Sequence, residues 1–224
     1  MAKDQLLHLH GEKEINQYKL SEVCDFIPEI HLSQDGTHSS QFLEGAINWE
    51  EVFHSQTSEV PFTARIEIAL EIVGQLEMLA EKYGIFLADR HNLNIMLQPT
   101  NNKSSIVFGN MNWKVFQVDT EFVYDAVKDT EGIKPDVNLR ARRGTLKVKN
   151  ERNEKFHRTG AVMTVLKYII ESIKNLPDTT AKRNEGLQRL NLLDSRWRDI
   201  WASRKDNFEE ITFKAMRKVL ESLR

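Results

Sequence analysis

The stretch LADRHNLNIML, residues 87–97, interrupts an apolar run with four consecutive polar side chains that begin at Asp89. One leucine and Asn94 follow, and then the chain becomes apolar again as Ile-Met-Leu. A polar segment between two apolar ones predicts a loop that is fixed between core elements. Asp and Asn favour tight turns as well as active sites, so a structural turn and a catalytic loop are both open interpretations.

A long amphipathic helix is predicted immediately before this loop. Residues 64–83 carry apolar side chains at helical spacing, so one full face of the helix should be buried. We expect Thr63 to cap its N-terminus and Gly84 to end it. After the loop come three β-like runs, at residues 95–97, 106–108 and 113–118.

The other predicted elements lie on both sides of this region. Upstream they are a helix at 11–25, strands at 27–32 and 39–43, and a short helix at 48–53. Downstream they are an irregular segment at 120–150, a buried helix at 156–175, and a helix at 208–223 with Asn207 and Glu210 at capping-box spacing. Most of the chain is helical and the strands cluster around the polar loop, which predicts an α+β fold.

The composition is that of an ordinary globular protein, with 40% hydrophobic and 29% charged residues. Its 31 basic and 33 acidic residues nearly balance, so there is no strong nucleic-acid signal. The sequence has no membrane-length apolar run and no signal-peptide pattern, so we expect a cytoplasmic protein or one exported without a cleavable signal peptide. The single cysteine, Cys24, excludes an internal disulfide and is expected to be a small core residue.

A third polar residue, Asp119, ends the strand-like run WKVFQVD. A hairpin would return this residue to the side of Asp89 and Asn94. Phosphoryl transfer needs a carboxylate near the incoming hydroxyl, and oxygen ligands that hold magnesium. Two carboxylates and one amide from neighbouring loops supply those groups, so the sequence predicts a magnesium–nucleotide site.

These residues resemble the catalytic loop of the protein-kinase-like superfamily. The string DRHNLN, from Asp89 to Asn94, is similar to the version in phosphatidylinositol 3- and 4-kinases, and Asp119 stands where the family has its Asp-Phe-Gly motif. The resemblance implies a protein-kinase-like fold that is mainly an α-helical large lobe, residues 44–224. Residues 1–43 would form a reduced small lobe, a helix with short β-strands.

The resemblance also implies a reaction, in which ATP and Mg²⁺ are the cofactors and a hydroxyl group accepts the phosphoryl group. Asp89 would be the catalytic base, and Asn94 and Asp119 would be the metal ligands. The acceptor stays open, since protein, lipid and small-molecule kinases share these three residues.

Four further residues would contact the nucleotide by the same resemblance. Gln41 and Leu43 would offer backbone groups of the hinge to the adenine, and Met96 would lie beneath its ring. Glu14 would be the helix glutamate that pairs with the lysine of the small lobe.

The sequence also departs from the family's pattern. No Gly-rich strand pair precedes the first helix, Thr120 and Glu121 replace the Phe and Gly of Asp-Phe-Gly, and the spacing from Asn94 to Asp119 implies an extended hairpin at 99–112. A catalytically inactive or truncated kinase-like module, acting as a protein-binding scaffold or regulator, is therefore the alternative. The basic segment 138–158 would either recruit an anionic substrate or be a solvated loop.

Overall fold

The computed structural model describes residues 12–54, 60–87, 94–118, 120, 123–125, 163, 166, 169–174, 181–203, 209 and 211–224. In these parts of the chain, helices combine with small antiparallel sheets. This architecture confirms the predicted α+β class. No helix among these residues is both long enough and apolar enough to cross a membrane.

The predicted long helix is α4, Phe62–Tyr83. Gly84 ends it in the left-handed conformation with φ 65°, and its N–H donates to the carbonyl of Ala80 at 3.1 Å, as expected for a glycine at this position. The expected cap by Thr63 is wrong, because Pro61 occupies the N-cap position and Thr63 lies inside the helix. A proline suits a helix start, since its fixed φ fits there and no N–H is left without an acceptor.

A four-stranded antiparallel sheet packs against α4, in the order β3-β5-β7-β6. The strands are β3 (Ile47–Asn48), β5 (Ile95–Thr100), β6 (Val107–Phe108) and β7 (Met111–Gln117). β5 and β7 pair from Ile95↔Gln117 to Thr100↔Asn112, which confirms the expected extended hairpin. The buried side chains of Leu97 and Val115 face the helix.

The N-terminal part contains α2 (Glu12–Val23) and the antiparallel pair β1 (Ile30–Leu32) and β2 (His38–Ser40). The short helix α3, Trp49–His54, follows. Asn48 precedes α3, and its Oδ1 accepts the N–H of Glu51 at 2.9 Å while its Nδ2 donates to the Glu51 carboxylate. The predictions of these elements are therefore confirmed, with ends shifted by up to three residues.

A second pair of strands was not expected from the sequence. β4, Ile85–Leu87, begins directly after the Gly84 cap, and it pairs antiparallel with β8, Val123–Asp125. Each strand has three residues, too few for a recognisable alternation. Both exist because two segments far apart in the sequence meet.

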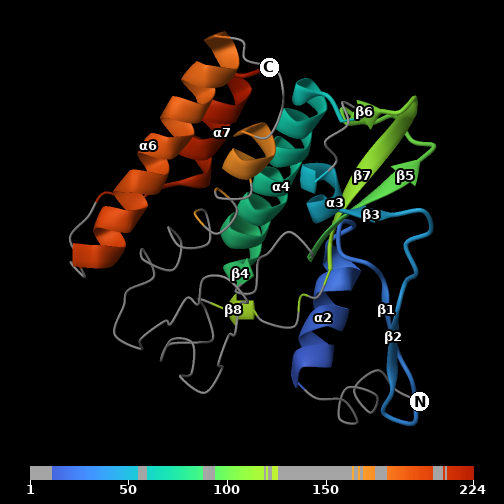
Figure 1. The fold of residues 1–224 in the computed structure, drawn as a ribbon. Helices are drawn as coiled ribbons and strands as arrows, with labels where there is room; N and C mark the ends of the chain where they lie inside the picture. The colour runs from blue at the N-terminus through green and yellow to red at the C-terminus, as the bar shows by residue number, and fades with distance from the viewer. Residues whose placement is uncertain are drawn as a thin grey trace.

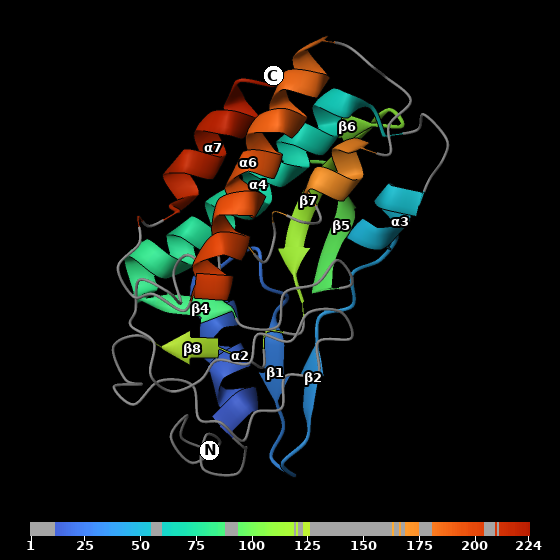
Figure 2. The same ribbon diagram turned by 60° about the vertical axis from the view of Figure 1, so that its left-hand side comes forward.

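The C-terminal part of the chain adds helices on the other side of α4. Residues 163, 166 and 169–174 are helical, within the predicted helix 156–175. They are followed by α6, Ala181–Ser203, and α7, Phe213–Glu221. The two views in Figure 1 and Figure 2 show α6 and α7 side by side, with α7 against α4.

The predicted start of the last helix is wrong. α7 begins at Phe213, and Thr212 is its N-cap, with a hydroxyl that accepts the N–H of Ala215 at 3.1 Å. Ile211 precedes this cap and is not helical, so a helix continuing from Asn207 is excluded. Phe213, Met216 and Leu220 form the buried face.

A continuous hydrophobic core joins α2, α4, the four-stranded sheet and the C-terminal helices, from Leu20 to Leu223. It includes Cys24, as expected. The expected division of the chain into a small lobe at 1–43 and a large lobe at 44–224 stays a prediction.

Two buried arginines hold the end of the 169–174 helix. Arg65 of α4 donates to the carbonyls of Val60 at 3.1 Å and Ser172 at 2.8 Å, and Arg183 of α6 donates to Ile173 at 3.0 Å and to the next carbonyl along the helix. Burial lowers the pKa of the Arg65 guanidinium, which nevertheless stays charged at neutral pH.

Arg65→Met should lower the free energy of unfolding by about 3 kcal/mol, because two buried carbonyls lose a charged donor. Urea denaturation followed by circular dichroism measures this loss. Arg189→Met is the control, since Arg189 pairs with Glu185 on the exposed surface of α6, and it should change stability by less than about 0.5 kcal/mol. Equal effects of the two substitutions would contradict the anchoring role of Arg65.

A second prediction concerns Gly186 of α6, which touches Leu223. A Cβ at Gly186 would overlap the Cδ methyl groups of Leu223 and lie 2.8 Å from its Cγ. Gly186→Ala should therefore destabilise the protein by about 1–2 kcal/mol despite the better helix propensity of alanine. In a Leu223→Ala background the same change should be neutral or stabilising, because the overlap is gone.

Gly74 of α4 gives the matched control for this prediction. A Cβ there would meet only the guanidinium of Arg217, at 3.8 Å. Gly74→Ala should gain up to about 1 kcal/mol from helix propensity alone. A stabilising Gly186→Ala in the otherwise unchanged protein would show that Leu223 does not pack closely on α6 at Gly186.

Candidate functional site

The polar segment that contains Asp89 and Asn94 connects two pairs of strands. The β5–β7 pair ends at Ile95↔Gln117, and the β4–β8 pair ends at Leu87↔Val123. Residues 88–94 connect β4 to β5, and residues 118–122 connect β7 to β8. Both sequence segments that carry the candidate site residues are therefore bounded by the same two strand pairs.

Asn94 is the candidate metal ligand that the structure describes. Its carbonyl accepts the N–H of Val118 at 2.9 Å, which extends the β5–β7 ladder by one step. The residue is 4% exposed and directly precedes β5.

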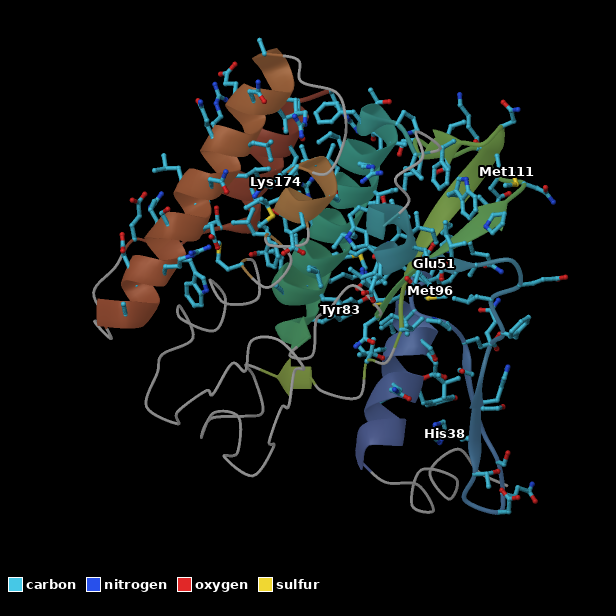
Figure 3. All side chains as sticks on the ribbon, in the orientation of Figure 1. His38, Glu51, Tyr83, Met96, Met111 and Lys174 are labelled. Atoms are coloured by element: carbon cyan, nitrogen blue, oxygen red, sulfur yellow. The ribbon has the colours of Figure 1, made fainter. Side chains whose placement is uncertain are left out.

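Met96 lies in the second strand of the four-stranded sheet. It is half-buried, and its cross-strand partners are Asn48 of β3 and Phe116 of β7. Figure 3 shows Met96 near the middle of the molecule, well away from His38 at the far end of β2. Met96 is thus the second residue of β5, two positions after Asn94.

The candidate hinge residues, Gln41 and Leu43, each have a backbone group that is already hydrogen-bonded within the protein. The N–H of Gln41 donates to the carbonyl of Glu29 at 2.7 Å, and the carbonyl of Leu43 accepts from Ala46 at 3.2 Å. Gln41 also lines a pocket of about 510 Å³ between α2 and β1. Met96 is not part of the lining of that pocket.

Several predicted site residues lie outside the described part of the chain. These are Asp89, Asp119, the side chain of Glu14 and the basic segment 138–158. Among the residues that the structure does describe, no group of three or more His, Cys, Asp or Glu side chains could hold a metal ion. The roles of Asp89, Asp119 and Glu14 therefore stay predictions.

Two buried glutamines near the strand ends were missed in the sequence. Gln75 of α4 is 4% exposed, and Gln117 at the end of β7 is fully buried. Gln75 does carry a signal, because it occupies a position on the apolar stripe of its helix, between Ile72 and Leu79. A polar side chain on such a stripe is buried and needs hydrogen-bond partners.

The turn between α2 and β1 packs against the same strand ends. The carbonyl of Phe26 accepts the N–H of Gln117 at 2.8 Å, and Lys114 of β7 donates to the carbonyl of Asp25 at 2.6 Å. Cys24 begins this turn and is 1% exposed. Burial raises the pKa of its thiol to about 11, with a further contribution from the negative charge of Asp25.

Comparison of the chain with protein-family models gives no match, and comparison with curated proteins gives no similar sequence.

Cys24 should be unreactive in the folded protein, because its thiol is buried and neutral at pH 8. A thiol reagent such as DTNB should label the native protein at least ~100-fold more slowly than the urea-unfolded protein.

The raised pKa also predicts that stability contributed by the neutral thiol is complete below about pH 9 and is lost as the pH rises towards 11. Rapid native labelling at pH 8 would show that the turn opens readily; Cys24→Ala should remove the pH effect.

Proposed function

We propose that this protein is an ATP- and Mg²⁺-dependent phosphotransferase with a protein-kinase-like fold, which transfers a phosphoryl group to a hydroxyl acceptor. One observation carries the proposal. The two segments that contain Asp89, Asn94 and Asp119 connect the same pair of strand ends, Ile95↔Gln117 and Leu87↔Val123. An arrangement that holds both segments close together is what a two-loop phosphoryl-transfer site requires.

The ladder that ends at Asn94 limits how far Asp119 can be from it. Directly opposite residues of an antiparallel pair have Cα atoms about 5 Å apart, and Val118 is opposite Asn94. Asp119 is the next residue, about 3.8 Å further along the chain. Its Cα is therefore within roughly 9 Å of that of Asn94, a span that two side chains can bridge through one ion with ligands at about 2.1 Å.

In this proposal each residue has a distinct task. Asn94 and Asp119 supply the amide and carboxylate oxygens that magnesium prefers, and Asp89 accepts the proton of the acceptor hydroxyl. The bound magnesium would neutralise charge on the phosphates. Met96, two residues after Asn94 and half-buried in β5, supplies an apolar surface for the adenine ring.

A second candidate function is a catalytically inactive kinase-like module that binds a protein partner. It is favoured by the segment that follows β2. The N–H of Gln41 is committed to Glu29, so it cannot also donate to an adenine while that bond exists. The next residue, Phe42, is 84% exposed, and exposed aromatic side chains are enriched at protein interfaces.

A thermal-shift titration with ATP and MgCl₂ tests the proposal. At an ATP concentration 100 times the Kd, binding should stabilise the fold by about 2.7 kcal/mol and raise Tm by roughly 5–10 °C. The magnesium-dependent part should be lost in Asp119→Ala. Asp89→Asn should keep the shift but lower phosphoryl transfer or ATP hydrolysis by at least ~100-fold, because it removes only the base.

Asp199→Ala is the matched control, because Asp199 is an exposed carboxylate on α6. This variant should show the full shift. No shift in the unaltered protein would overturn the phosphotransferase and favour the partner-binding module. A shift in all variants alike would place the nucleotide somewhere other than at Asp119.

A further inference from the structure

Gln75 joins α4 to the last residues of β7. Its Nε2 donates to the carbonyl of Val115 at 3.0 Å and lies 3.1 Å from a carboxylate oxygen of Glu71, one helical turn earlier. Its Oε1 accepts a hydrogen bond from Nε2 of Gln117 at 2.7 Å. The amide of Gln75 therefore ties the helix both to the backbone and to a side chain of the strand.

Gln117 makes the second half of this connection. Its side chain reaches α4 through Gln75, while its backbone N–H donates to Phe26 in the turn after α2. The adjacent residue, Val118, bonds to Asn94. Three parts of the chain thus meet at the end of β7, two residues before Asp119.

The free-energy cost of leaving one buried amide without its partner explains why the Gln75–Gln117 pair would fix the position of β7 relative to α4. A buried amide that loses its partner keeps the full penalty of its desolvation, so the pair favours one arrangement of helix and strand over shifted ones. Apolar side chains at the same positions would pack there too, but they would not select the register of the strand end.

We propose that Gln75 and Gln117 are positioning residues, which hold the ends of β5 and β7 so that Asn94 and Asp119 face one metal ion. The inference rests on the proposed function for the metal, while the holding of the strand ends stands independently of it.

Hydrogen exchange of the protein without nucleotide tests the first part. Gln117→Leu and Gln75→Leu should each raise the exchange rate of the Val118 amide by at least about tenfold. The reference is the change in the exchange rates of backbone amides in the middle of the four-stranded sheet. Ile66→Val is the matched control, because Ile66 is a buried residue nearer the start of α4, and its cavity lowers stability without touching the strand ends.

The double variant Gln75→Leu/Gln117→Leu keeps the test decisive if a single variant does not fold. It replaces both amides by apolar groups, so neither glutamine is left without the other, although the carbonyl of Val115 loses its donor and stability should fall by about 1–3 kcal/mol. Rapid exchange at Val118 in this folded variant, beyond that in Ile66→Val, supports the inference. Unchanged exchange at Val118 in the folded variants overturns it, whether or not the protein binds ATP.

The magnesium concentration that gives half of the ATP-dependent shift in Tm tests the second part. This magnesium midpoint should rise about tenfold in the double variant and stay unchanged in Ile66→Val. The change in Tm with ATP and no magnesium should be equal in the two variants. Equal magnesium midpoints, in a protein that does bind Mg²⁺ and ATP, overturn the positioning role. Absence of any ATP effect in the unaltered protein instead overturns the proposed function, and the exchange result still decides whether the glutamines hold the strand ends.

Discussion

The antiparallel ladder between β5 and β7 is the constraint on which the rest of the structure depends. It begins with the Asn94–Val118 hydrogen bond and runs to Thr100↔Asn112. Its apolar face packs on α4. The Asn94–Val118 hydrogen bond fixes the point at which the polar segments begin on each strand. Since β4 and β8 pair as well, each polar segment is fixed at both of its ends.

α4 is held in turn from the opposite side. Arg65 connects its first turns to the 169–174 helix, and ion pairs of Arg217 with Glu77 and of Arg224 with Glu67 connect it to α7 and the C-terminal residues. The buried guanidinium acts on carbonyls that have lost water, so it matters more for stability than the exposed end of the Arg224 pair. The helix that supports the polar loop is therefore embedded between a sheet and a helical layer (Figure 2).

Local patterns predicted the elements whose signals are local. α4 has an apolar stripe along one face and a glycine at its end, and the β5–β7 hairpin has two β-like runs with turn residues between them. The β4–β8 pair could not be predicted, because each three-residue strand depends on a partner about 38 positions away. The predicted start of α7 is wrong because Asn207 and Glu210 have capping-box spacing in the sequence, whereas the N-cap of α7 is Thr212.

The candidate site shows the same division between local and distant signals. The spacing of Asp89 and Asn94 and the later Asp119 can be read along the sequence, whereas the Gln75–Gln117 pair joins two residues that no short motif contains. Those glutamines, the 24–27 turn and the first step of the ladder converge on the residues next to Asp119. A site built this way is positioned by the core of the protein. Its geometry would therefore depend on the register of β7 more than on the sequence of the loop itself, and a chain could keep DRHNLN intact yet lose the proposed metal site through a change at Gln75 or Gln117.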